Sequence, residues 1–159
     1  MAAAALLAAG GIGAVTGGAA DAEAPAFTDF ARLTPPASPN RWLVAPAGYM
    51  PAAPDETAPV FGVPAVRLAQ AWTTIVERQP RTRVTAVSAD GLQVEAEQRS
   101  AVFRFVDRIS FRAIPLTPTS STLAAYSRAE TGYWDLGVNR RRLRAWLAEL
   151  EANLGAQAP

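Results

Sequence analysis

The hydrophobic positions of the chain first define a helix in the segment 64–79. Apolar side chains recur there every third or fourth residue, at Val66, Ala69, Trp72, Ile75 and Val76. This spacing places them on one face of an α-helix. Pro64 suits the first helical position, and Pro80 ends the pattern because proline has no backbone N–H to donate. We therefore predict a helix over 64–79 whose apolar face belongs to the core.

A second helical pattern covers 139–154, near the end of the chain. Its apolar stripe consists of Leu143, Trp146, Leu147, Leu150 and Leu154. Such a stripe is typical of a helix that packs one side against a core. Asn139 is a typical N-cap and Gly155 a typical residue just beyond a helix C-terminus. We expect this helix to begin at Asn139.

The segment 82–98 predicts a β-hairpin with Asp90-Gly91 in its turn. Its second strand alternates strictly, with Leu92, Val94 and Ala96 facing inward and Gln93, Glu95 and Glu97 facing outward. Two carboxylates two residues apart also occur in catalytic or metal sites. Because the alternation places Glu95 and Glu97 on the outer face, we expect a solvated face instead.

One or two further strands are predicted over 99–114, and one polar residue interrupts their apolar side. The side chains of Phe103, Phe105, Asp107, Ile109 and Phe111 share one parity. An unpaired carboxylate on that side costs several kcal/mol. Either a bulge or turn at Val106-Asp107 turns Asp107 away, or an arginine pairs with it. A turn at 116–121 and a last strand over 122–128 complete the pattern.

These elements predict an α+β domain over 64–155. Its antiparallel sheet of about four strands carries both helices on one face. The preceding segment, 21–63, is a Pro-rich arm: nine prolines between residues 21 and 64 exclude long regular elements. Recurring aromatic residues indicate that the arm lies on the domain, with a short edge strand near Arg41-Trp42-Leu43-Val44.

Residues 1–20 carry no charge and consist mostly of Ala and Gly. They resemble a secretory signal or membrane anchor, although the basic start of a signal is missing. A single transmembrane helix and a disordered tail are the alternatives. A signal or anchor implies a periplasmic or membrane-anchored location, and a disordered tail a cytoplasmic one.

Composition removes several classes of chemistry. The chain has no Cys and no His, which excludes thiol catalysis, disulfides, Cys/His zinc sites and imidazole acid–base catalysis. We predict no metal and no cofactor. The formal net charge is +1, so no overall field attracts nucleic acid. All fifteen basic residues are Arg, which fits either a GC-rich genome or selection for bidentate anion binding.

Most of the polar chemistry lies in 126–146. Arg140, Arg141, Arg142 and Arg144 open the last helix, where the macrodipole is positive and each exposed cation is unfavourable by roughly 0.3–1 kcal/mol. Internal carboxylates or a bound anion must offset this cost. Arg140, and less clearly Arg142, are expected in a partly buried ion pair. The predicted ligand or structural cluster contains Asp107, Arg128, Asp135, Asn139, Arg140 and Arg142.

Three motifs follow one another along the chain. They are Ser38-Pro39-Asn40, Phe103-Arg104-Phe105-Val106-Asp107, and Asp135-Leu136-Gly137-Val138-Asn139-Arg140-Arg141-Arg142, the last preceded by Ser127-Arg128 and Gly132. Their order and spacing resemble the bacterial domain of unknown function 1499 family over about residues 38–150. The resemblance implies no particular activity, and members often look exported or membrane-anchored. The chain lacks the cysteines that many members carry near the first motif. Glu130 replaces an expected arginine, which favours an internal salt-bridge network.

The leading functional hypothesis is a non-enzymatic, exported or membrane-associated domain that binds a partner protein or a small apolar or anionic ligand. A helix across a curved sheet leaves room for a cavity, which Trp72, Phe103, Phe105, Phe111 and Trp146 would line, unless these residues only fill the core. One alternative is an accessory subunit of a membrane complex, contacting it through the arm and the N-terminal segment. The least favoured alternative is an enzyme with Asp107 and Asp135 as acid and base and with Arg128 and Arg140 stabilising an anion.

Overall fold

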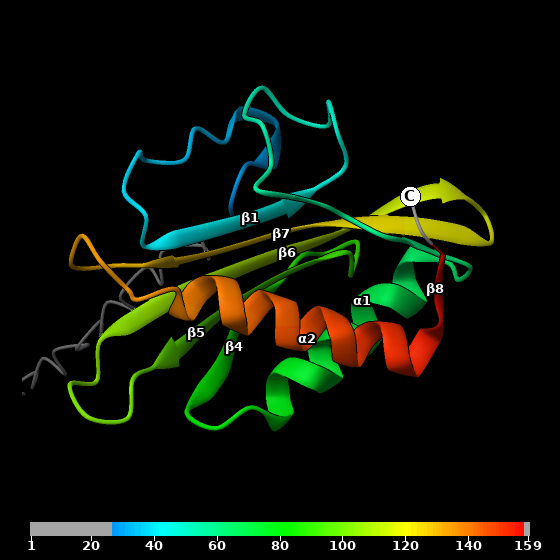
Figure 1. Cartoon of the computed structure of the whole chain (residues 1–159). Coiled ribbons are helices and arrows are strands. Elements are labelled where there is room, and N and C mark those ends of the chain that lie inside the picture. The colour runs from blue at the N-terminus through cyan, green and yellow to red at the C-terminus, as the bar shows by residue number, and fades with distance from the viewer. Residues whose placement is uncertain (1–26, 158–159) are drawn as a thin grey trace, which may run out of the picture.

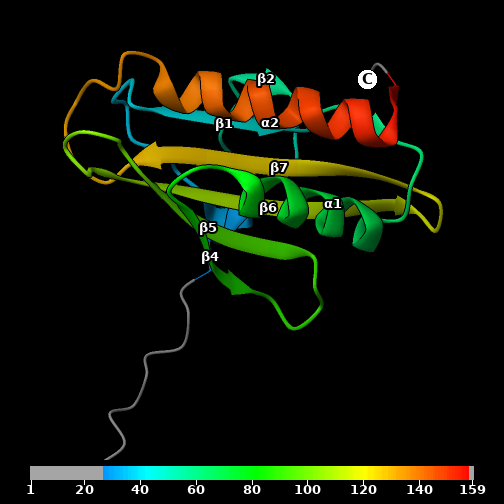
Figure 2. The ribbon, with the colours of Figure 1, turned by 90° about the horizontal axis from the view of Figure 1, so that it is seen from below.

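The computed structural model describes residues 27–157, which form one twisted sheet with two helices on one face (Figures 1 and 2). The elements are η1 (Phe30–Arg32), β1 (Arg41–Ala45), β2 (Glu56–Thr57), β3 (Val60–Phe61), α1 (Ala65–Arg78), β4 (Thr82–Val87), β5 (Gln93–Arg99), β6 (Val106–Thr117), β7 (Ser120–Ala129), α2 (Val138–Leu154) and β8 (Ala156–Gln157). The α+β class is therefore as predicted. The signal or anchor segment predicted over 1–20 lies outside the described residues.

The sheet is larger than predicted. Its order is β2-β1-β7-β6-β5-β4, and the short strands β3 and β8 bring the described total to eight. Neighbouring strands are antiparallel except for β1 and β2, which run parallel. The expectation of about four strands was wrong because the Pro-rich segment itself supplies β1, β2 and β3. Strand β1 is not an edge strand, since it lies between β7 and β2.

Both predicted helices are confirmed, with boundaries shifted by at most one residue. Their apolar stripes pack on the sheet face formed by residues such as Val94, Ile109 and Leu123. Val66, which was predicted to belong to the stripe of α1, is 50% exposed instead. Trp72 of α1 stacks on Phe111 of β6 with 4.5 Å between ring centroids, and it meets Trp146 of α2 edge-on at 5.6 Å. Aromatic pairs of this geometry add to the stabilisation from apolar burial.

The opposite face of the sheet is only partly covered. The segment before β2 lies across β1 and β7, above the sheet in Figure 1, and forms a smaller core. This core contains Phe30, Leu43, Ala45, Met50, Ala124 and Tyr126. The remainder of this face, over β5 and β6, carries polar side chains.

The predicted hairpin is present as β4 and β5, with Gly91 at φ 69° in its turn. Glu95 and Glu97 do face away from the helices, but both residues are buried. The expectation of a solvated face was therefore wrong. The Thr28 backbone N–H donates to Glu95, and the guanidinium groups of Arg83 and Arg99 pair with Glu97. Alternation within the strand predicts the side of the sheet on which Glu95 and Glu97 lie. It does not predict which residues of other segments cover them.

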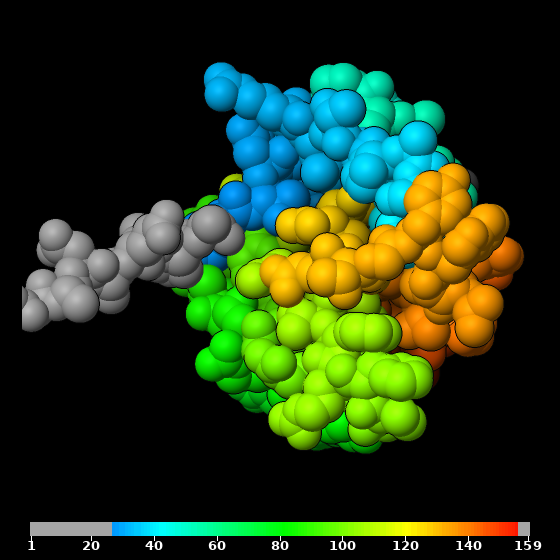
Figure 3. Space-filling view, turned by 90° about the vertical axis from the view of Figure 1, so that its left-hand side faces the viewer, coloured from blue at the N-terminus to red at the C-terminus, as the bar shows by residue number. Residues whose placement is uncertain are grey.

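Two loops project from the same end of the molecule. They are the β5–β6 loop (100–105) and the β7–α2 loop (130–137), which face the viewer in Figure 3. No helix among residues 27–157 is both long and apolar enough to span a bilayer.

Candidate functional site

The beginning of α2 is held to the sheet by a buried polar group that we call the Arg142 cluster. It consists of Gln98, Asp107, Ser127, Asn139 and Arg142. Arg142 donates from Nη2 to the Asp107 carboxylate and from Nε to Gln98 Oε1 at 2.7 Å. The Arg142 side chain is 6% exposed and the Asp107 side chain is 13% exposed. The guanidinium thus meets its counter-charge away from bulk water.

The remaining hydrogen bonds of the cluster close it around Asn139. Arg142 Nη1 donates to Ser127 Oγ at 2.9 Å and to Asn139 Oδ1 at 2.6 Å. Asn139 Nδ2 donates to the backbone oxygen of Asn40 at 3.0 Å and to Asp135 Oδ2 at 2.8 Å. The three sequence motifs therefore meet at one place, although they lie far apart in the chain.

Asn139 does not cap α2 as predicted. The helix begins at Val138, after Gly137 in the left-handed region at φ 74°. The Asp135 carboxylate fills the capping role, because it accepts from the backbone N–H groups of Gly137 and Asn139 at 2.8 and 2.9 Å. Its negative charge also offsets the positive end of the helix dipole.

Of the two alternatives for Asp107, the pairing with an arginine is correct, and the partner is Arg142. Arg140 is exposed, and its guanidinium carbon lies 4.9 Å from the centre of the Trp42 ring. Arg128 is also outside the Arg142 cluster, on the other face of the sheet. The regular β6–β7 register through Asp107 contains no bulge there.

The Arg142 cluster is built as a support. Asp107 is engaged by Arg142, and both Asp135 oxygens accept hydrogen bonds from the start of α2. This geometry does not place the two aspartates as an acid–base pair. A satisfied buried network of this kind fixes one arrangement of helix and strands.

The five aromatic residues predicted to line a cavity do not share one. Trp72, Phe111 and Trp146 pack on each other in the core. Phe103 and Phe105 lie in the β5–β6 loop and are 75% and 56% exposed. The reason is that the β5–β6 loop begins at Ser100, so the alternation of β6 starts only at Val106.

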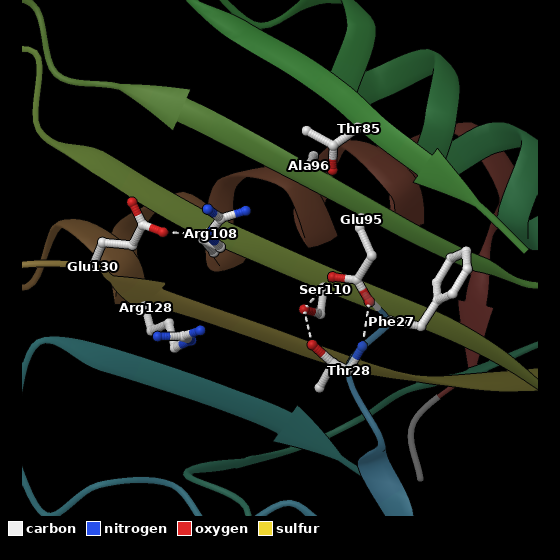
Figure 4. A pocket seen from close by; sticks show the side chains of 9 residues that line it. All are labelled: Phe27, Thr28, Thr85, Glu95, Ala96, Arg108, Ser110, Arg128 and Glu130. Carbon is white, nitrogen blue, oxygen red and sulfur yellow. Dashed lines mark hydrogen bonds and ion pairs between the residues drawn. The ribbon is translucent and has the colours of Figure 1, made fainter. Parts of the chain in front are cut away.

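A cavity of about 490 Å³ lies instead on the open face of the sheet. We call it the open-face cavity, and Figure 4 shows it from close by. Its lining consists of Phe27, Thr28, Thr85, Glu95, Ala96, Arg108, Ser110, Arg128 and Glu130. Strand alternation brings most of these side chains to one face, while the chain before η1 forms one wall.

One end of the open-face cavity is a hydrogen-bonded carboxylate. Glu95 accepts from the Thr28 backbone N–H at 2.8 Å, from Gln93 Nε2 at 3.0 Å and from Ser110 Oγ at 2.6 Å. The Thr28 hydroxyl lies 2.6 Å from that of Ser110. This end is polar, negative and fixed in position.

The other end carries arginines on adjacent strands. Arg128 of β7 is directly opposite Arg41 of β1 on one side and Arg108 of β6 on the other. Arg41 pairs with Asp55, and Arg108 Nε lies 2.6 Å from Glu130 Oε1. Arg128 has no carboxylate partner among residues 27–157. Figure 4 shows Arg108, Arg128 and Glu130 together, apart from Glu95.

Of this cavity, the sequence indicated only Arg128 as a candidate site residue. Arg108 and Ser110 alternate with the core residues of β6, so the sequence indicates that they share the outer face of the sheet. It does not indicate how β6 pairs with β7, or β7 with β1. Within residues 27–157, no three acidic side chains are grouped so as to hold a metal ion.

The fold and its sites define a small α+β domain with a closed polar support on one face of its sheet and an open, charged cavity on the other. The chain belongs to the family described as "Protein of unknown function (DUF1499)", whose model matches residues 33–150. This match confirms the resemblance seen in the motifs.

No curated protein matches the chain. Among solved structures, a START superfamily protein from Mycobacterium smegmatis is similar, with 14% identity and a TM-score of 0.36. The similarity covers 61% of this chain and 93% of that one. A likeness this low assigns neither a ligand nor an activity.

Proposed function

We propose that the domain is a non-enzymatic binding protein whose open-face cavity takes a small anionic molecule. The observation that carries this proposal is the position of Arg128. It lies between two other arginines across the sheet, it lines the cavity, and it lacks a carboxylate partner among the described residues.

Like charges directly opposite on neighbouring strands are destabilising, by an amount comparable to the roughly 0.2–1 kcal/mol of a favourable pair. Asp55 and Glu130 offset this cost at Arg41 and Arg108. An anion beside Arg128 would offset the remainder. Guanidinium groups suit carboxylates and phosphates, because two parallel N–H donors match two oxygens.

The remaining lining sets the size and orientation of the ligand. A volume of about 490 Å³ fits a small molecule. The Glu95 carboxylate repels an anionic group at its end of the cavity, so the ligand's charge lies at Arg128. The hydroxyls of Ser110 and Thr28 already donate within the Glu95 network, so they can only accept hydrogen bonds from polar, uncharged parts of the same molecule.

The test is an NMR titration of the full chain with inorganic phosphate and with succinate, following arginine side-chain N–H signals. We expect saturable shifts of the Arg128 signal. Arg128→Gln should weaken binding by about tenfold to a hundredfold, the effect of losing a charge-assisted contact. Arg67→Gln is the matched control, since Arg67 is exposed on α1, away from this face. An absence of shifts in the parent, or equal affinities of the two variants measured from the remaining arginine signals, would refute the proposal.

We also propose that the domain acts at a membrane, because residues 1–20 form an uncharged, largely small and apolar run. The experiment compares the full chain with a variant that carries both Leu6→Arg and Ile12→Arg. The two proteins are expressed at equal levels. Cell fractionation should find the parent in membranes and the variant displaced from them. An accessory role in a membrane complex would appear as a second protein that copurifies only with the membrane-bound parent. Equal distribution of the two forms contradicts membrane attachment through this segment.

A further inference from the structure

Large apolar side chains project from the two loops at one end of the molecule. We call them the aromatic tip: Val102 (78% exposed), Phe103 (75%), Phe105 (56%), Tyr133 (59%), Trp134 (72%) and Leu136 (84%). The β5–β6 and β7–α2 loops that carry them lie at the same end, facing the viewer in Figure 3. Single exposed apolar residues are ordinary, but a group of this size marks an interaction surface.

The aromatic tip is organised rather than loosely scattered. The rings of Phe103 and Phe105 stack with centroids 5.5 Å apart, and those of Tyr133 and Trp134 meet edge-on at 5.3 Å. The rings are thus paired before any partner covers them.

Each of the two loops contains one non-glycine residue in the left-handed region. Only three non-glycine residues among those described have positive φ, and two of them are Arg104 at 55° and Leu136 at 53°. A leucine in the left-handed region costs free energy, and its exposure forfeits apolar burial as well. Strain of this kind persists where the surrounding structure imposes it, commonly at functional sites.

The charges around the aromatic tip are positive. Arg104, Arg140 and Arg141 are exposed and have no carboxylate partner among residues 27–157. The acidic side chains nearby are already engaged within the domain: Asp107, Glu130 and Asp135. This end therefore offers cations beside apolar rings.

From these observations we propose that the aromatic tip docks on the surface of an anionic lipid bilayer. Trp and Tyr favour the bilayer interface, where an apolar ring and a polar atom are both accommodated. The arginines reach phosphate groups while their aliphatic stems stay among apolar groups. Charge complementarity thus selects an anionic membrane rather than an uncharged apolar partner.

Docking by the aromatic tip must be distinguished from attachment through residues 1–20. Six residues, 21–26, separate the uncharged run 1–20 from Phe27, and six residues span at most about 20 Å. The inference does not depend on the open-face cavity, which Arg128→Gln tests separately. Tryptophan fluorescence is a suitable signal, because residues 1–20 contain no Trp and cannot contribute to it.

The experiment adds the full chain to phosphatidylcholine vesicles, with or without phosphatidylglycerol, that contain brominated lipid. Bromine quenches only tryptophan near the acyl chains. Of the other three tryptophans, Trp72 and Trp146 are buried, and Trp42 is partly buried against the core beneath Arg140. We expect quenching that increases with phosphatidylglycerol and is largely lost in Trp134→Phe. Loss of quenching in Trp134→Phe, with vesicle binding retained, locates the contact at the tip.

A matched pair of leucine variants tests the energetics. Leu136→Ser should weaken partition into anionic vesicles by about tenfold, as expected for removing one buried leucine. Leu116→Ser should leave it unchanged, because Leu116 is 52% exposed but lies in the β6–β7 hairpin at the opposite end (Figure 1).

Three results would overturn the proposal. The first is the absence of vesicle binding. The second is binding without quenching of Trp134, which would assign the attachment to residues 1–20 alone. The third is self-association that Leu136→Ser abolishes without any effect on vesicles, which would make a second copy the occupant of the aromatic tip.

Discussion

Arg142 and Arg140 are two residues apart, yet the structure predicts a large loss of stability on removing Arg142 and a small one on removing Arg140. Arg142→Ala leaves the Asp107 carboxylate buried without its cation. Breaking a buried pair on one side costs about 3–5 kcal/mol of the free energy of unfolding. Arg140→Ala removes an exposed contact with the Trp42 ring, worth about 0.5–1 kcal/mol. Urea unfolding of both variants checks the order, and equal losses would contradict the structural role of the Arg142 cluster.

Tyr126 carries a buried hydroxyl with no hydrogen-bond partner among residues 27–157. Such a group is a desolvation cost, so Tyr126→Phe should raise the free energy of unfolding by about 1 kcal/mol. Burial raises the pKa of Tyr126 above its ordinary value of 10.0, against the opposing effect of Arg128 and Arg41.

Because the pKa of Tyr126 is raised, the free energy of unfolding should depend on pH in the alkaline range. Above pH 10 the unfolded chain loses the Tyr126 proton while the native state still holds it, so stability falls as pH rises further. Tyr126→Phe should remove this part of the alkaline loss. Tyr133→Phe is the control, because Tyr133 is exposed. Chemical unfolding at neutral and alkaline pH measures the difference, and a variant as alkali-sensitive as the parent would refute the assignment.

At the scale of one element, the β4–β5 turn depends on Asp90. The Ser88 hydroxyl, the Leu92 backbone N–H and Arg112 all hold the pKa of Asp90 below its ordinary value of 3.8, Ser88 most strongly. A depressed pKa stabilises the fold above the unfolded value, and that contribution is lost as pH falls through the native value.

We therefore expect both Ser88→Ala and Arg112→Gln to move the Asp90 pKa up toward 3.8, because each removes a group that lowers it. NMR titration of the Asp90 side-chain carboxyl carbon measures both shifts directly. An Asp90 pKa that stays unchanged in Ser88→Ala would refute the assignment of Ser88 as the main cause.

The elements also show what the sequence determines. Periodicity predicted α1, α2 and the β4–β5 hairpin, because these patterns are local. It indicated β1 only as an edge strand and missed β2 and β3, since the position of β1 inside the sheet depends on contacts such as Arg41 with Arg128. The helical pattern also favoured Arg140 over Arg142 for the partly buried ion pair. A helical wheel shows which residues flank an apolar stripe, but it does not show on which side Asp107 lies.

The candidate site was less predictable than the fold, for a related reason. Alternation correctly placed Glu95 on the face away from the helices. Its burial arises from Thr28, which is 67 residues away in the chain. No pattern within the strand records where that segment returns.

At the scale of the whole molecule, the two faces of the sheet differ in whether their central arginine is paired with a carboxylate. On the helix face, Arg142 is paired with Asp107 and enclosed by hydrogen bonds. On the open face, Arg128 lies opposite Arg41 and Arg108 with no acidic partner among residues 27–157. Because Arg128 is exposed, this repulsion is modest, and the anion proposed above would relieve it.

This asymmetry predicts a trade-off between stability and binding. Without a bound anion, Arg128→Gln should increase the free energy of unfolding by about 0.2–1 kcal/mol, because it removes repulsion between neighbouring strands. The gain should shrink at high salt, which screens exposed charges. Urea unfolding in a chloride buffer of low and then high ionic strength measures both effects, with Arg67→Gln as the exposed control. A variant that is less stable than the parent at low salt would mean that Arg128 is already compensated within the chain, and the anion would then have no cost to relieve.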